Sequence, residues 1–356
     1  MWVARLHGIG DIRISDEPVP APGPGECLVR VTAAGICGSD LHWFDQGGIG
    51  DAQLSHPLIL GHEAAGVIAD GPRRGQRVAI DPAISCGACR PCRDGYRNLC
   101  IRVRFLGHGG TDGALREFMP WPEDLLPPLP DELSDADGAV LEPFGVAIHS
   151  YDLGHLPLAG TAAVIGCGPV GVLLIQVLRA AGARSIVGVD PLPHRREAAA
   201  KFGADRVAAP APSGGAAAAP GGAARAPGGG SGLAGPATLG GLTGGGVDVA
   251  FECAGNGDGV RLAVDAARPG GRVVLAGIPD DDLTTFRASV ARRKGLTIAM
   301  VRRMNEVYPR AIGMAARGQA DLGPVVSHRF PLREAAAAFG AAARRTGLKV
   351  IIEPGS

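Results

Sequence analysis

The second half of the chain alternates short apolar runs with Ala-rich stretches of helical spacing. Residues 161–165 and 185–190 predict buried strands, and residues 170–181 and 195–202 predict the helices that follow them. This alternation is typical of parallel βαβ units, so we predict an α/β domain with a Rossmann-type, doubly wound parallel sheet. Three more strands and one helix extend the pattern, at residues 247–253, 272–276, 296–301 and 259–267 respectively.

The first 150 residues show a different pattern, in which short β-type runs are separated by Gly and Pro. The runs at residues 27–32, 66–68 and 77–80 predict strands. We expect an irregular, mainly β domain here. Beyond Val301, two helices and a final strand are predicted at residues 308–317, 333–345 and 348–353.

One segment fits neither pattern. Residues 208–246 consist almost entirely of Ala, Gly and Pro, and Arg225 is their only charged residue. Such a segment cannot bury enough apolar surface to offset the entropy that it would lose on ordering. We therefore expect a flexible crossover, whose composition is also typical of a linker without a function of its own.

Composition and charge limit the classes of partner. The 356 residues are 46% hydrophobic and 20% charged, and 35 Lys and Arg balance 35 Asp and Glu. A chain without net charge offers no field that would hold nucleic acid or an acidic membrane surface. No signal-peptide pattern opens the chain, and no run of about 18 apolar residues occurs in it. We expect a soluble cytoplasmic protein with a small-molecule partner.

Four of the eight cysteines stand within fifteen residues, at positions Cys86, Cys89, Cys92 and Cys100. Four thiolates at this spacing on a Gly- and Pro-rich loop can surround one tetrahedral zinc ion and leave no position open. We predict a structural zinc site. The alternative, four unrelated buried thiols, requires that metal-ligand spacing arose by chance.

A second set of possible metal ligands is spread over two segments. Cys37 lies in the stretch Gly-Ile-Cys-Gly-Ser-Asp-Leu-His, and His62 and Glu63 directly follow Gly61. Cys37, His62 and a carboxylate would give three mixed ligands and leave a fourth position for water or a substrate oxygen, as a catalytic zinc requires. On its own, His62 would more often be a structural histidine.

A glycine-rich turn follows the strand predicted at residues 161–165 and opens the next helix. It reads Gly166-Cys167-Gly168-Pro169-Val170-Gly171. In this setting the glycines allow a tight turn and the close approach of a pyrophosphate, which the helix N-terminus attracts. Asp190, at the end of the next predicted strand, would bind ribose hydroxyls and repel a 2′-phosphate. We favour NAD as the cofactor, while Arg195 and Arg196 nearby leave NADP open.

Taken together, these motifs resemble those of the zinc-containing medium-chain dehydrogenases, and within them the sorbitol (L-iditol) dehydrogenase branch. Its other shared motifs are Leu141-Glu142-Pro143, Phe251-Glu252-Cys253-Ala254-Gly255 and Val326-Ser327-His328-Arg329-Phe330-Pro331. The likeness covers essentially the whole chain. It implies a GroES-like catalytic domain over residues 1–155 and 303–356, a Rossmann domain over residues 156–302, two zinc ions per chain, and a homotetramer or homodimer.

The resemblance also assigns metal ligands by position. Cys37 and His62 match the catalytic zinc ligands of the family. Glu63 and Glu142 both match acidic residues at that site, and the sequence leaves open which of them binds the metal. The alternative for Glu142 is an ordinary helix-capping or salt-bridged glutamate.

Three further residues receive roles from the same resemblance. Ser39 matches the hydroxyl next to the substrate oxygen, His42 matches a proton-relay histidine, and Arg303 matches the substrate-contacting arginine of the polyol branch. That branch tends to have tyrosines where this chain has Trp43 and Met304. The shape of the substrate pocket is therefore expected to differ.

The resemblance thus predicts a zinc-dependent oxidoreductase that transfers a hydride from a polyol or sugar-like secondary alcohol to NAD. Two related activities stay open, those resembling L-idonate 5-dehydrogenase and L-threonine 3-dehydrogenase. A dinucleotide-binding protein without turnover is a third interpretation. It predicts a broken set of zinc ligands, whereas Cys37 and His62 are both present.

Overall fold

Six strands form the sheet predicted for the second half of the chain, in the order β14-β13-β12-β15-β16-β17. The structure, a computed structural model, describes residues 1–210 and 244–355. Each neighbouring pair of strands is parallel, which confirms the predicted α/β class. The strands are β12 (Thr161–Ile165), β13 (Ser185–Val189), β14 (Arg206–Ala208), β15 (Val247–Glu252), β16 (Ala267–Leu275) and β17 (Thr297–Met300).

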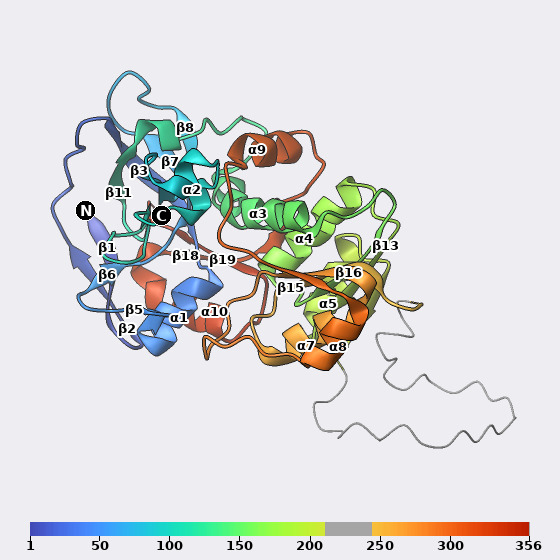
Figure 1. Cartoon of the computed structure of the whole chain (residues 1–356). Coiled ribbons are helices and arrows are strands. Elements are labelled where there is room, and N and C mark those ends of the chain that lie inside the picture. The colour runs from blue at the N-terminus through green and yellow to red at the C-terminus, as the bar shows by residue number, and fades with distance from the viewer. Residues whose placement is uncertain (211–243, 356) are drawn as a thin grey trace, which may run out of the picture.

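Helices cover the faces of this sheet (Figure 1). Three of them were predicted, and their ends agree with the prediction to within two residues. The chain order of the strands reverses between β12 and β15, and ligands of such sheets bind beyond the carboxyl ends of the strands at this point. The helices are α4 (Pro169–Ala180), α5 (Pro193–Lys201), α7 (Gly257–Ala266) and α8 (Ala288–Lys294).

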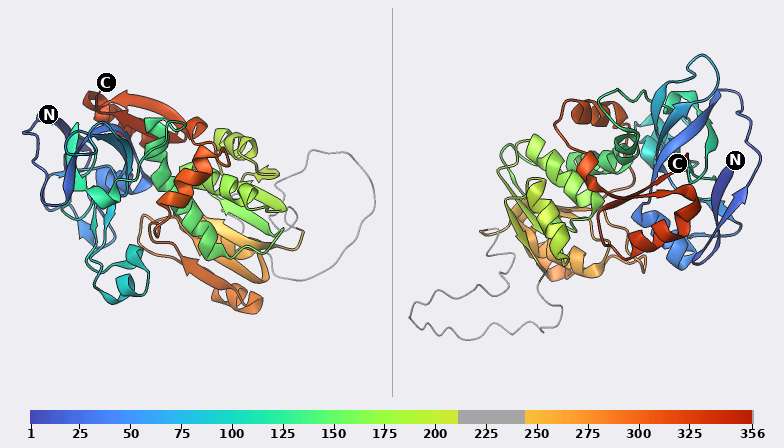
Figure 2. Two further views of the ribbon diagram at one scale, coloured as in Figure 1. Left: turned by 90° about the horizontal axis from the view of Figure 1, so that it is seen from above. Right: turned by 180° about the vertical axis from the view of Figure 1, so that it is seen from behind.

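The mainly β domain contains a second six-stranded sheet, in the order β18-β19-β3-β7-β8 with β11 paired to β3. The C-terminal tail supplies β18 and β19, and β19 pairs antiparallel with β3. Both ends of the chain therefore lie on this domain (Figure 2). The strands are β3 (Glu26–Gly35), β7 (Glu63–Ile68), β8 (Arg77–Ile80), β11 (Phe118–Pro122), β18 (Val326–Pro331) and β19 (Lys349–Glu353).

Smaller elements complete the first domain and the tail. A three-stranded sheet has the order β2-β1-β6, and two-stranded sheets join β4 to β5 and β9 to β10. The predicted tail helices are present as α9 and α10. The elements are β1 (Trp2–Gly8), β2 (Asp11–Asp16), α1 (Gly38–Gln46), β4 (Gly48–Ile49), β5 (Ala52–Gln53), β6 (Leu58–Ile59), β9 (Ala83–Ile84), α2 (Arg90–Arg93), β10 (Arg104–Phe105), α9 (Tyr308–Ala316) and α10 (Ala335–Ala343).

The mainly β character predicted for the first domain is confirmed, but the sequence did not predict the long helix at its end, α3 (Asp135–Gly154). Ser134 caps it by accepting a hydrogen bond from the Asp137 amide at 3.2 Å. Gly138, which weakens a helical pattern in the sequence, is buried: a Cβ there would lie 2.7 Å from the Cβ of Ala65 on β7. The helix packs on β3 and β7 of one domain and on α4 of the other, so it joins the two cores.

The predicted flexible segment at residues 208–246 falls largely on residues 211–243, which lie outside the described residues. Ala208 itself ends β14 and pairs with Val189, so the segment begins inside the sheet. Within the described ranges, no helix combines the length and apolar character needed to cross a bilayer.

Candidate active site

Two antiparallel strands bring the predicted metal ligands together. Gly35 at the end of β3 pairs with Glu63 at the start of β7. Cys37 follows β3 as the N-cap of α1, and His62 directly precedes β7. The ligand atoms of Cys37, His62 and Glu63 lie within 4.8 Å of one another. A thiolate, an imidazole and a carboxylate in this arrangement fit zinc and leave one position for water or substrate.

Asp40 organises this group, a role that the motif analysis missed. Its Oδ2 accepts the Cys37 amide at 2.9 Å, its Oδ1 accepts the Gly61 amide at 3.3 Å, and Oδ1 also lies 3.4 Å from His62 Nδ1. Burial would raise the pKa of the Asp40 carboxyl, but His62 and the two amides outweigh it and hold that pKa below its ordinary value. With Nδ1 turned toward Asp40, His62 Nε2 is the ring nitrogen left for a metal. The available signal was an acidic residue three positions after a helix N-cap.

Lys349 forms a buried ion pair with Glu63, a second relationship that the sequence did not reveal. Its Nζ donates to both carboxylate oxygens, at 2.7 and 2.6 Å, and to the carbonyl of Ile36 at 3.0 Å. Burial opposes the charge on Lys349, but Glu63 outweighs it and raises the pKa of the amine. A Cβ on Gly35 would lie 2.1 Å from Glu63 Oε2, so this carboxylate requires glycine opposite it. Glu63 is thus a candidate ligand that already has a cationic partner.

Glu142 lies in the middle of α3, near the ligand group but outside the set within 4.8 Å. The residue is buried, and its carboxylate makes neither a hydrogen bond nor an ion pair among the described residues. Burial raises the pKa of Glu142 to about 7; Glu63 adds to the rise and His62 opposes it. The helix-capping and salt-bridge alternatives for Glu142 therefore do not match its surroundings.

The two predicted proton-transfer residues lie one turn apart on α1. Ser39 Oγ is 3.4 Å from His62 Nε2, beside the position left for a metal. His42 Nδ1 lies 3.4 Å from Gln46 Oε1 and 3.4 Å from a carboxylate oxygen of Asp280. Asp280 belongs to the segment after β16, so His42 faces the Rossmann domain rather than the ligand group.

Arg303 lies over the ring of Phe105, which in turn contacts the candidate ligand His62. Its guanidinium carbon is 4.2 Å from the centre of the Phe105 ring, and that ring lies 5.2 Å from the His62 ring. Burial, with Arg302 adding to it, lowers the pKa of Arg303 to about 10. Its Nη1 is buried without a hydrogen-bond partner among the described residues. An unsatisfied buried donor of this kind is available to a ligand.

His108 is a further residue of this region that no sequence motif indicated. Its ring meets Trp43 edge to face at 5.2 Å and lies 6.5 Å from Phe105. Burial, followed by the charge of Arg303, lowers the pKa of His108 to about 4. Trp43 is buried, and Met304 packs on α3, where a Cβ on Gly145 would lie 2.4 Å from its sulfur.

The four clustered cysteines converge as predicted from their spacing. The sulfur atoms of Cys86, Cys89, Cys92 and Cys100 lie within 4.8 Å of one another. Arg102 Nη2 lies 3.4 Å from the sulfur of Cys86. Backbone hydrogen bonds, led by that of Ala88, lower the pKa of Cys86 to about 5, which favours the thiolate that a metal binds. A set of four sulfur donors fits a tetrahedral structural zinc.

The glycine-rich turn joins β12 to α4 at the point where the strand order reverses. Gly166 has φ 92°, and a Cβ there would lie 2.6 Å from the Ala254 nitrogen. A Cβ on Gly171 would lie 2.0 Å from the Gly166 oxygen. Pro169 and Val170 form the first turn of α4, with Gly168 as its N-cap. The turn therefore has the tight backbone and the open helix N-terminus that suit a pyrophosphate.

Asp190 directly follows β13 beside this turn and is buried. Its Oδ2 accepts the Cys167 amide at 2.8 Å and its Oδ1 accepts the Leu192 amide at 2.9 Å, which leaves each oxygen able to accept a second hydrogen bond. Arg196 Nη1 donates a hydrogen bond to the backbone carbonyl of Asp190 at 2.8 Å. Arg195 lies against the turn, and its Nε is buried without a partner among the described residues.

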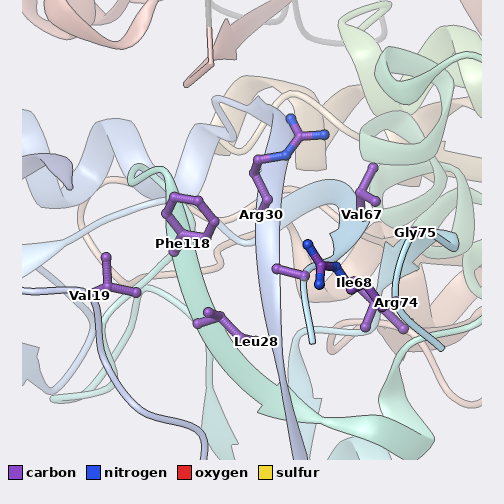
Figure 3. Close-up of a pocket in the computed structure, with 9 residues that line it drawn as sticks. Val19, Leu28, Arg30, Val67, Ile68, Arg74, Gly75 and Phe118 are labelled. Carbon is purple, nitrogen blue, oxygen red and sulfur yellow. The ribbon is translucent and has the colours of Figure 1, made fainter. Parts of the chain in front are cut away.

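A separate hollow of about 520 Å³ lies on the sheet of the first domain (Figure 3). None of the candidate zinc ligands lines it, so it is distinct from the candidate active site. Its lining residues are Val19, Leu28, Arg30, Val67, Ile68, Ala69, Arg74, Gly75 and Phe118.

Comparison with known families gives matches in both domains. The alcohol dehydrogenase GroES-like domain matches residues 23–131, and the zinc-binding dehydrogenase domain matches residues 169–317. Sorbitol dehydrogenase of Bacillus subtilis is 33% identical, over 99% of this chain and 97% of its own.

Solved structures agree with this match. 2R,3R-butanediol dehydrogenase of Bacillus subtilis superimposes with a TM-score of 0.83 and 28% identity, over 99% of both chains. An alcohol dehydrogenase of Escherichia coli in complex with NADH superimposes with a TM-score of 0.85 and 26% identity, also over 99% of both chains.

Proposed function

Because this chain belongs to the zinc-binding dehydrogenase family, we propose that it oxidises a polyol or sugar-like secondary alcohol to the ketone and transfers the hydride to NAD. Family membership makes the chain an oxidoreductase that acts on CH–OH groups and uses zinc and a nicotinamide dinucleotide. The sorbitol dehydrogenase relative supports the polyol class of substrate.

One observation carries the substrate class. Arg303 has a buried, unpaired nitrogen and lies above Phe105, whose ring packs against the ligand His62. A polyol that holds its reacting carbon at the metal group has further hydroxyls to offer this guanidinium. A simple alcohol has none, so the arginine would favour the polyol.

The residues around the metal position have separate tasks in this proposal. Zinc held by Cys37, His62 and a glutamate supplies a Lewis acid that lowers the pKa of a substrate hydroxyl. When that hydroxyl ionises, Ser39 Oγ would accept its proton and release its own hydroxyl proton to His42, one helical turn further on, which would release a proton from its other ring nitrogen toward solvent. This order follows from the place of Ser39 beside His62 Nε2.

The third ligand in our proposal is Glu63, because its carboxylate belongs to the group within 4.8 Å. Glu142, which has no other partner among the described residues, then holds a water molecule at the edge of the site. The four sulfur atoms of the cysteine cluster hold a second, structural zinc, so the chain would bind two ions.

NAD is our proposed acceptor, since the buried carboxylate of Asp190 can accept the ribose hydroxyls and would repel a 2′-phosphate. Arg195, with its unpaired Nε, is the feature that favours NADP instead. Initial rates with each cofactor at equal concentration separate the two, and a preference for NADP would contradict the role given to Asp190.

A sugar acid is the second candidate substrate class. It is favoured by Arg303 and Arg302 standing side by side, because a carboxylate pairs with a guanidinium more strongly than a hydroxyl does.

A homotetramer or homodimer in the cytoplasm remains a prediction. Met300 on β17, the edge strand of the parallel sheet, is 64% exposed, and a subunit interface at this edge would cover it. Light scattering of the purified chain measures the oligomeric state.

The proposal is tested by initial rates of NAD reduction on sorbitol, xylitol, L-iditol, L-idonate, L-threonine and 2-butanol, with the zinc content measured in parallel. We expect two zinc ions per chain and turnover of the polyols. Arg303→Ala should lower kcat/KM for polyols more than for 2-butanol, whereas Arg302→Ala, whose side chain is exposed, should not. Two zinc ions without turnover on any substrate would overturn the polyol assignment.

A further inference from the structure

The loop that carries Arg303 is fastened to the four-cysteine lobe by two reciprocal amide hydrogen bonds. We call residues 86–100 the lobe and residues 302–306 the arginine loop. From the lobe, Asn98 Nδ2 donates to the Arg302 carbonyl at 2.9 Å. From the loop, Asn305 Nδ2 donates to the Gly95 carbonyl at 3.0 Å. The partners are 204 and 210 residues apart in the chain, so these bonds join two distant segments.

Two more contacts lie at the same junction. Arg97 Nε is 3.0 Å from Glu306 Oε1, in an exposed ion pair that contributes little alone. Asn98 Nδ2 also lies 3.4 Å from Nε2 of His149 on α3. Because Asn98 is buried, a partner that loses its amide cannot simply turn to water. The lobe, α3 and the arginine loop therefore meet at one residue.

The backbone of the arginine loop needs such anchors. Arg303 has φ 56° and Glu306 has φ 51°, a region that residues other than glycine rarely adopt. Each of these residues directly follows one of the anchored residues, Arg302 and Asn305. If the anchors were removed, the backbone would relax toward negative φ, and the Arg303 side chain would leave its place above Phe105.

We propose that the four-cysteine lobe is a positioning platform for Arg303 and thereby sets the selectivity for polyols. Asn98 and Asn305 are positioning residues: they fix the backbone on both sides of Arg303 and touch no substrate. A zinc site closed by four thiolates has no open position for a substrate and takes no direct part in the chemistry. The lobe would therefore influence substrate choice only through the position of Arg303. What Arg303 binds rests on the proposed function, whereas its orientation by the lobe does not.

The first test compares Asn98→Ala and Asn305→Ala with a matched control, Arg93→Ala. Arg93 donates to the Ala88 carbonyl at 2.8 Å within the lobe, and among the described residues neither of the two forms a hydrogen bond to the arginine loop. We expect the ratio of kcat/KM for xylitol to that for 2-butanol to fall about tenfold in both asparagine variants, mainly through KM for xylitol. The control should stay within twofold of the wild type, and zinc content should not change.

A double variant separates positioning from a general loss of structure. In an Arg303→Ala background, Asn98→Ala should leave the substrate ratio unchanged, because the residue through which it acts is gone. A further fall in that background would overturn the proposal. Should Asn98→Ala fail to fold, Asn305→Ala tests the same junction from its exposed side.

A second readout needs no substrate. Phenylglyoxal modifies accessible arginines, and peptide mass spectrometry reports its rate at Arg303. We expect that rate to rise several-fold in both asparagine variants and to stay at the wild-type value in Arg93→Ala. An unchanged rate would overturn the positioning role. A raised rate in a protein that oxidises no polyol would support the positioning role and refute the proposed function instead.

Discussion

Asp40 and His62 face each other in the candidate zinc site, with Asp40 Oδ1 3.4 Å from His62 Nδ1. The same carboxylate accepts the amide of Cys37 at 2.9 Å. One buried side chain therefore orients the imidazole ligand and fixes the backbone of the thiolate ligand. Residues in this position behind a metal ligand tune affinity without touching the metal.

We expect Asp40→Asn to weaken zinc binding about 10- to 100-fold, because the amide cannot stabilise the imidazole as the carboxylate does. Competition with a chelator measures the affinity directly. Asp45→Asn is the matched control, since Asp45 is exposed on the same helix. Equal zinc affinity in the two variants would show that the Asp40 carboxylate has no such role.

The buried pair of Glu63 and Lys349 predicts a large cost when one partner is removed. Lys349→Met leaves the Glu63 carboxylate without its cation in a site where both side chains are almost fully buried. We expect the free energy of unfolding to fall by about 3–5 kcal/mol. Adding Glu63→Gln should restore most of that loss in the zinc-free protein, because no uncompensated charge then remains. Urea unfolding of the zinc-free proteins at pH 7 measures both values, so that the loss of Glu63 as a metal ligand does not enter the comparison.

The exposed pair of Arg310 and Asp152 is the control for that experiment. Arg310→Met should lower the free energy of unfolding by about 1 kcal/mol or less, because solvent screens this pair. A loss of the same size in Lys349→Met would mean that burial does not strengthen the inner pair.

Asp81 predicts a dependence of stability on pH. Burial raises the pKa of its carboxyl to about 6, with Glu306 and Asp124 adding to the rise. The folded chain thus holds this proton more tightly than the unfolded chain, and stability falls as pH rises from about 4 to about 6. Asp81→Asn should therefore be more stable than the wild type by about 2–3 kcal/mol above pH 7. The difference should disappear toward pH 4.

Asparagine at position 81 keeps an acceptor for the Ala83 amide, which lies 3.1 Å from the present carboxylate. Urea unfolding at several pH values, with wild type and variant in parallel, cancels the titration of all other groups. A difference between wild type and Asp81→Asn that stays constant from pH 4 to pH 7 would refute the raised pKa of Asp81.

The parallel sheet could be predicted closely because strands buried on both faces are continuous apolar runs. β12 begins and ends at the predicted residues. α3 was not predicted, although Ser134 and Asp137 form a capping box, because Gly138 and Pro143 interrupt the helical pattern. Those residues are tolerated since the helix is buried between two domains, a condition that no local pattern expresses.

Some residues of the candidate site could likewise be predicted from the sequence and others could not. Cys37 and His62 stand in short motifs at strand ends, so their sequence neighbourhood marks them. Lys349 meets Glu63 across 286 residues and looks like an ordinary strand residue until β19 is placed beside β3. The sequence around Arg303 gave no local sign of its left-handed backbone, and the preceding residue, Arg302, is bonded to Asn98, which lies 204 residues away in the chain.

The glycine-rich turn predicts a separation of two effects at Gly166. Alanine there must adopt φ 92° and must also place its Cβ 2.6 Å from the Ala254 nitrogen, a contact that forces the turn to move. Gly182 has φ 81° with nothing within 4 Å of a Cβ, so Gly182→Ala carries the backbone cost alone, about 1–2 kcal/mol. We expect both variants to lose stability, but only Gly166→Ala to lose affinity for NADH, by about tenfold or more. Fluorescence titration of NADH measures the affinity. Equal NADH affinity in the two variants would mean that moving this turn has no effect on the dinucleotide. The dinucleotide would then not bind close to the turn.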